Sequence, residues 1–118
     1  MRQTTDAYRL ERIEEIGRQL TGLLEDGTVT RELLLTDFRT QWLVTTPLYN
    51  IGEQVYALSD ELKSRYPMIP WGGVSGLRHR LVHDYEGTNW RIIASIVFDE
   101  LPSFLEEVSM IRRGSAAV

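Results

Sequence analysis

Apolar residues recur at every third or fourth position over most of this 118-residue chain. A helix that packs against a core with one face shows this spacing, because a turn takes about 3.6 residues. The first run predicts a helix from about Asp6 to Glu25, closed by Asp26-Gly27. Its expected core face consists of Leu10, Ile13, Ile16, Leu20 and Leu24.

The next run predicts a second, longer helix from about Asp37 to Arg65, preceded by a short helical turn for which Thr30 or Thr36 could serve as a cap. Pro47 falls inside it, and an interior proline costs ~3 kcal/mol or kinks the helix. We therefore expect the long helix to bend or to begin at this point. Its apolar stripe consists of Val44, Leu48, Ile51, Val55, Leu58 and Leu62.

The clearest break is the segment 67–73, with two prolines and two glycines. A third helix is expected after it, from about Pro70 or Trp71 to Tyr85. Thr88 or Asn89 can cap a fourth helix with a broad apolar face that reaches Ile111. Pro102 should bend that helix or start a new segment, and residues 114–118 should form a disordered tail.

No segment alternates apolar and polar residues as a half-buried strand does, so the chain is expected to be all-α. The short connections favour antiparallel neighbours, which predicts an up-and-down antiparallel bundle of four main helices. The length suits a single domain covering residues 1–118. A bundle of this size could extend its core by dimerising.

Composition limits the possible chemistry. The chain has no cysteine, which excludes disulfides and thiolate metal sites and fits a reducing cytoplasm. No apolar run approaches the ~20 residues that a membrane-spanning helix needs, so we expect a soluble, cytoplasmic protein that does not bind membranes. The net charge is −4, but residues 63–91 hold five basic against two acidic side chains. A local positive cleft could therefore bind a phosphate.

Both histidines lie in one short motif, Arg78-His79-Arg80-Leu81-Val82-His83-Asp84-Tyr85. An imidazole transfers protons near neutral pH, and arginine binds phosphate through planar donors. His79 and His83 are four residues apart and share a helix face. Arg78 and His83 are separated by ~140° around the helix, but arginine is long enough for both to border one groove.

This combination points to cleavage of RNA at the 2′-hydroxyl. Histidine can take a proton from the hydroxyl and give one to the leaving 5′-oxygen, and arginine can stabilise charge on phosphorus. The substrate supplies the nucleophile, so no metal or other cofactor is required. DNA would be spared because it lacks the 2′-hydroxyl.

Other interpretations remain open. The motif could be the solvated end of a capped helix, or His79 and His83 could bind a metal, although no third ligand is evident. Glu53, an acid inside the apolar rhythm of the long helix, either faces the motif or is solvated. Trp71 and Trp90 flank the motif and could stack on bases, but packing in the core or in a dimer is the commoner role.

Several segments between Ile51 and Leu105 resemble, in order, the HepT-like toxins, which are HEPN-superfamily ribonucleases of prokaryotic toxin–antitoxin pairs. The most specific are the Pro-Trp turn at residues 70–71 and the Arg-x4-His-x-Tyr motif. The others are Ile51-Gly52-Glu53, Leu58-Ser59-Asp60-Glu61-Leu62 and Asp99-Glu100-Leu101-Pro102.

The resemblance implies a HEPN helical bundle and a metal-independent endoribonuclease of a type VII toxin–antitoxin pair. Arg78 and His83 fall on the catalytic positions of the family. His79 stands where relatives usually have asparagine, so it could assist or orient as a second imidazole. Pro47 and Tyr49 also depart from the usual pattern, which could reshape the wall of the cleft.

The resemblance further implies a homodimer in which two motifs line one cleft. The partner would be an MntA-like nucleotidyltransferase antitoxin that silences the toxin by AMPylation of the motif tyrosine, here Tyr85. AMP groups beside the cleft should repel RNA, as phosphates would. The alternative is a non-catalytic dimeric module that binds a nucleotidyltransferase or RNA without cutting it.

Overall fold

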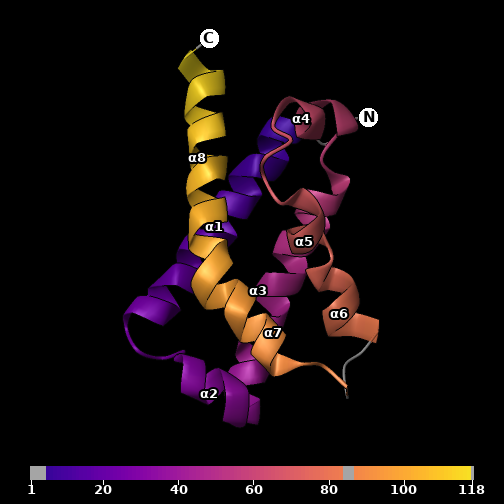
Figure 1. The fold of residues 1–118 in the computed structure, drawn as a ribbon. Coiled ribbons are helices and arrows are strands. Elements are labelled where there is room, and N and C mark those ends of the chain that lie inside the picture. The colour runs from indigo at the N-terminus through magenta and orange to yellow at the C-terminus, as the bar shows by residue number, and fades with distance from the viewer. Residues whose placement is uncertain (1–4, 84–86, 118) are drawn as a thin grey trace.

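The computed structural model describes residues 5–83 and 87–117, and every regular element within these ranges is a helix (Figure 1). The fold is therefore all-α, as the apolar spacing predicts. The elements are α1 (Asp6–Glu25), α2 (Arg31–Thr36), α3 (Phe38–Ala57), α4 (Asp60–Arg65), α5 (Trp71–Ser75), α6 (Leu77–His83), α7 (Trp90–Ser95), the π-helical segment η1 (Ile96–Glu100) and α8 (Leu101–Ala117).

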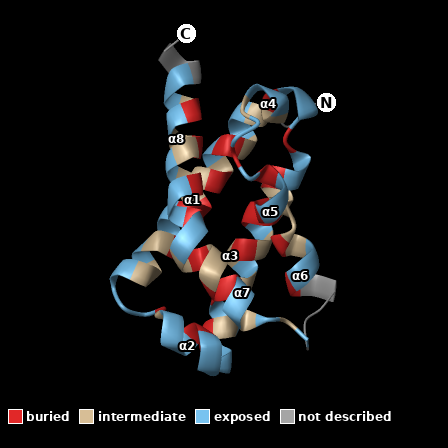
Figure 2. Ribbon diagram, in the orientation of Figure 1, coloured by how far each residue is buried: buried red, intermediate tan, exposed pale blue. Residues whose placement is uncertain are grey.

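The long helix α3 lies at the centre of the bundle. It packs against α1 on one side and against α5 and α6 on another, while α8 packs along α1 (Figure 1). Buried residues gather on the faces where these helices meet, and exposed residues cover the outside (Figure 2). The α3 stripe that the sequence predicts is buried from Val44 to Leu58.

The first helix has the bounds predicted for it. Thr5 caps α1 by accepting a hydrogen bond from the Tyr8 N–H at 3.2 Å. After α1, Gly27 adopts a positive φ of 83°, which a residue with a side chain rarely adopts. The proposed cap Thr30 accepts from the Leu33 N–H at 3.1 Å, so it starts α2, and the alternative Thr36 is the last residue of α2.

The prediction of one helix from Asp37 to Arg65 was wrong. α3 ends at Ala57, Leu58 is extended with ψ 148°, and Ser59 caps a separate helix α4. Asp6 fixes this break, because its carboxylate accepts from the Ser59 N–H at 3.0 Å and from the Ser59 hydroxyl. Leu58 stays buried across the break, which is why the apolar rhythm conceals it.

Pro47 does not begin or end a helix. α3 starts at Phe38 and continues through the proline to Ala57. The carbonyl that loses its hydrogen bond belongs to Leu43, whose side chain is 45% exposed. Water can reach this side of the helix, which limits the cost of the proline.

The third predicted helix is also divided. α5 ends at Ser75, Gly76 forms a turn whose N–H donates to the Gly72 carbonyl at 2.9 Å, and α6 follows. The structure describes α6 as far as His83, so the predicted end at Tyr85 lies outside the described residues.

The fourth helix begins where Asn89 accepts hydrogen bonds from the Arg91 and Ile92 N–H groups. A new segment starts near Pro102, as predicted, because η1 widens the helix and the Leu101 N–H donates to the Ile96 carbonyl. α8 then runs through Gly114 to Ala117, over residues for which a disordered tail was predicted. No helix in the described part of the chain is long and apolar enough to cross a membrane.

Candidate active site

Arg78 lies on α6 where this helix comes closest to α3. The contact depends on Gly52, which has no side chain to separate the two backbones. A Cβ atom at Gly52 would lie 3.1 Å from the Arg78 amide nitrogen and 3.2 Å from the Val74 carbonyl oxygen. The glycine therefore brings the start of the motif against the central helix.

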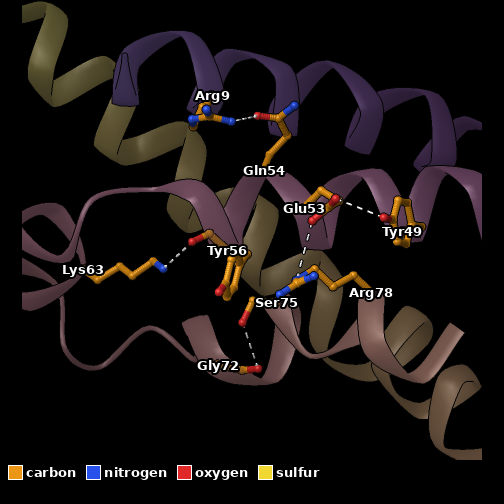
Figure 3. A network of polar contacts seen from close by, with 9 residues as sticks. All are labelled: Arg9, Tyr49, Glu53, Gln54, Tyr56, Lys63, Gly72, Ser75 and Arg78. Atoms are coloured by element: carbon orange, nitrogen blue, oxygen red, sulfur yellow. Dashed lines mark hydrogen bonds and ion pairs between the residues drawn. The ribbon is translucent and has the colours of Figure 1, made fainter. Parts of the chain in front are cut away.

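Glu53, the next residue of α3, faces Arg78 (Figure 3). Its Oε1 atom lies 3.6 Å from the Arg78 Nε atom, and the two side chains are 40% and 33% exposed. An ion pair this exposed stabilises the fold little, typically by ~0–1 kcal/mol. Of the two interpretations of Glu53, the structure supports the one in which it faces the motif.

Tyr56 covers the other side of the Arg78 guanidinium. The guanidinium carbon lies 3.8 Å from the centroid of the Tyr56 ring, a cation–π contact, and Tyr56 is 60% exposed. The sequence analysis did not select this tyrosine. Its position was a usable signal, because it lies three residues after Glu53 and therefore on the same side of the helix.

Tyr49 completes the cluster from one turn earlier on α3. Its hydroxyl donates a hydrogen bond to the Oε2 atom of Glu53 at 3.0 Å (Figure 3). This hydrogen bond raises the pKa of Tyr49 above its ordinary value, with burial and the charge of Glu53 adding to the effect and Arg78 opposing it. The phenol therefore stays protonated and keeps Glu53 oriented at neutral pH.

The cluster leaves much of the Arg78 guanidinium available. Its Nε side faces Glu53 and one face rests on Tyr56, but its terminal nitrogens make no hydrogen bond to any other residue in the described ranges. Such donors match the oxygens of a phosphate in pairs. Arg78 is therefore held in place with its phosphate-binding edge open.

The other motif residues differ in what the structure describes. His79 and Arg80 are exposed on α6. His83 is the last residue of the same helix, but its side chain, like all of Tyr85, lies outside the described residues. The pairing of Arg78 with His83 and the modification of Tyr85 therefore stay predictions.

Trp71 does not stack on bases. It is 7% exposed, its ring meets Phe104 edge-to-face at 5.8 Å, and its Nε1–H donates to the Tyr66 carbonyl at 3.0 Å. Trp90 packs partly buried against the same core. Both tryptophans beside the motif therefore hold the helices together, which is the commoner role that the sequence analysis named.

Metal binding by the motif has no further support in the described part of the chain. No group of three histidine, aspartate or glutamate side chains there could hold a metal ion. The pair His79 and His83 as metal ligands stays a prediction.

Comparison with known proteins identifies relatives of the chain. The family model "Ribonuclease HepT-like" matches residues 9–111. The Methanocaldococcus jannaschii protein named "Putative RNase MJ0127" is 37% identical over 70% of this chain and 69% of its own length. The Thermococcus cleftensis protein named "Probable ribonuclease HepT" is 31% identical over 71% of this chain and 80% of its own length. No solved structure matches the chain significantly.

Proposed function

The chain belongs to the HepT-like ribonuclease family, and on that basis we propose that it is a metal-independent endoribonuclease that cuts RNA at its Arg-x4-His motif. The observation that carries the proposal is the environment of Arg78. Glu53 and Tyr56 hold this arginine at the surface while its terminal donors remain open to a phosphate.

The proposed mechanism uses the 2′-hydroxyl of the substrate as the nucleophile. His83 serves as the principal proton-transfer group, taking the hydroxyl proton or protonating the leaving 5′-oxygen, and His79 assists or orients. Arg78 binds the scissile phosphate and stabilises the added negative charge as the hydroxyl attacks phosphorus. The products are a 2′,3′-cyclic phosphate and a free 5′-hydroxyl.

The test is cleavage of end-labelled RNA by purified protein with a chelator present throughout. Arg78→Ala and His83→Ala should each slow cleavage by about 10²-fold or more. Arg80→Ala is the matched control, because Arg80 is an exposed arginine of the same helix and should be dispensable. Unchanged rates in both motif variants would rule the assignment out. RNA binding without cleavage by the parent would favour the non-catalytic module.

We further propose that the protein is the toxin of a type VII toxin–antitoxin pair and acts as a homodimer. The partner is an MntA-like nucleotidyltransferase, which transfers AMP from ATP to the Tyr85 hydroxyl and releases pyrophosphate. The added phosphate would lie beside the motif and repel RNA. Support comes from the family match and from the tyrosine two residues after His83.

Co-expression with a nucleotidyltransferase of this class tests the silencing. Mass analysis should show the mass of one AMP group on the peptide that contains Tyr85, with cleavage lost in parallel. Tyr85→Phe should escape both effects, while Tyr66→Phe, a tyrosine outside the motif, should not. Silencing of Tyr85→Phe as complete as that of the parent would contradict this mechanism.

A further inference from the structure

Four aromatic side chains follow one side of α3: Phe38, Trp42, Tyr49 and Tyr56, which we call the aromatic stripe. They are separated by four, seven and seven residues. At about 100° per residue these steps keep all four within about 40° of one direction around the helix, and the stripe extends over about 27 Å. It is separate from the buried stripe that contains Val44.

The aromatic stripe is open to solvent. Phe38, Trp42 and Tyr56 are 50%, 58% and 60% exposed, and Tyr49 is half-buried. The rings of Phe38 and Trp42 meet edge-to-face, with centroids 4.9 Å apart and planes at 71°. Large aromatic rings grouped on a surface mark a binding site more often than isolated exposed residues do.

Guanidinium groups accompany the rings at both ends. The guanidinium carbon of Arg39 lies 5.0 Å from the Phe38 ring centroid, and that of Arg78 lies 3.8 Å from the Tyr56 ring centroid. The only carboxylate on α3 itself is Glu53, which Tyr49 and Arg78 already engage. The first 62 residues contain eleven carboxylates, so this surface is much less acidic than the region around it.

Rings with neighbouring cations are how proteins bind single-stranded nucleic acid, since bases stack on the rings and phosphates meet the cations. We propose that the aromatic stripe binds single-stranded RNA and leads the strand to Arg78. This inference rests on the proposed function, because Arg78 is the phosphate-binding end of the path. Duplex RNA, whose bases are already stacked on one another, should be excluded.

The experiment measures binding separately from cleavage. The probe is a fluorescent single-stranded oligonucleotide with 2′-O-methyl riboses, which cannot be cut because it lacks the nucleophilic hydroxyl. Trp42→Leu removes the ring but keeps an apolar side chain, and should raise the Kd about tenfold. Trp42→Phe retains a stacking face and should stay within about twofold of the parent. Tyr8→Leu is the control, because Tyr8 is a 47% exposed aromatic on α1, outside the stripe.

Each remaining outcome overturns the inference. These are no binding by the parent, equal affinity for a duplex of the same sequence, or equal effects of Trp42→Leu and Trp42→Phe. Light scattering on the same samples covers the rival occupant: if Trp42→Leu halves the particle mass, the stripe is an interface between copies of the chain.

Cleavage of unmodified RNA by the parent, measured in parallel, separates this inference from the proposed function. Ring-dependent binding without any cleavage leaves the stripe supported and removes the catalytic assignment. Cleavage with binding that ignores the rings does the reverse.

Discussion

Two arginine–glutamate pairs join helices in this protein, and they are built differently. Arg112 on α8 hydrogen-bonds Glu14 on α1, whose side chain is only 16% exposed. Arg78 on α6 approaches Glu53 on α3 only to 3.6 Å, and Tyr49 shares the carboxylate. The first arginine spends its donors on the fold, whereas the second is supported by a ring and a distant carboxylate.

The difference separates an arginine that fastens helices from one that can bind a ligand. A hydrogen-bonded, sheltered carboxylate fixes both the position and the donors of its arginine. A stacked guanidinium keeps its position through the ring face while its edge remains available. The predictions below test this contrast.

The largest effect is expected from replacing each arginine by lysine. Arg78→Lys keeps the charge but loses the planar donors and the stacked face, so kcat/KM for RNA should fall about 10²-fold with little change in the melting temperature. Arg112→Lys can still reach Glu14, and should leave kcat/KM within about threefold of the parent. Cleavage assays and thermal melts on both variants measure this. A similar loss of activity in both would abolish the distinction.

Gly52→Ala should give the next largest effect, by separating the helices that carry the Arg78–Glu53 pair. The added methyl group meets backbone atoms of α5 and α6 at 3.1–3.2 Å, and such crowding costs about 1–3 kcal/mol of unfolding free energy. Gly22→Ala on α1 is the matched control. Nothing lies within 4 Å of its Cβ position, so it should stabilise by about 0.4–1 kcal/mol. Urea unfolding of both variants gives the comparison, and a neutral Gly52→Ala would mean that α6 can move away freely.

The Arg112–Glu14 pair should make stability depend on pH. The pKa of Glu14 is lowered, first by a hydrogen bond from Ser109 and then by Arg112, although burial opposes the shift. A lowered folded-state pKa gives stability that is present above the ordinary value of 4.5 and is lost as the pH falls through the folded value. Glu14→Gln should remove this acid-side loss, which amounts to at most about 1 kcal/mol. Unfolding free energies across acid pH test it, and an unchanged slope would contradict it.

The smallest effect is expected from Tyr49→Phe. The variant keeps the aromatic ring but loses the hydrogen bond that orients Glu53, so Arg78 is held less firmly. Cleavage should slow by about two- to fivefold while binding of uncleavable RNA stays the same. Weakened binding would instead show that the hydroxyl itself contacts the RNA.

Local signals explain which elements could be predicted from the sequence. The bounds of α1 followed from its spacing and its closing Asp26-Gly27 turn. The break between α3 and α4 was missed because Leu58 continues the apolar rhythm although its backbone is extended. What fixes that break is Asp6, far away in sequence, whose contact with Ser59 no periodicity can reveal.

The candidate site shows the same limit. Arg78 and Glu53 could be selected because a basic motif and an acid in an apolar stripe are unusual locally. Tyr56 was missed because its role arises from a residue on another helix, brought near by the close approach at Gly52. Its spacing from Tyr49 and Glu53 was visible, but nothing in the sequence said which helix would meet that side.

The π-helical segment Ile96–Glu100 has a consequence for how this chain can vary. A turn closed by an i→i+5 hydrogen bond holds one residue more than an α-helical turn, which rotates everything downstream by about 100°. That rotation lets α7 face α2 while α8 faces α1, where Leu105 packs against Gly17. Letters within the segment can change, but its length cannot. Deleting one residue there would turn Leu105 away from its neighbour and direct the apolar side of α8 into solvent.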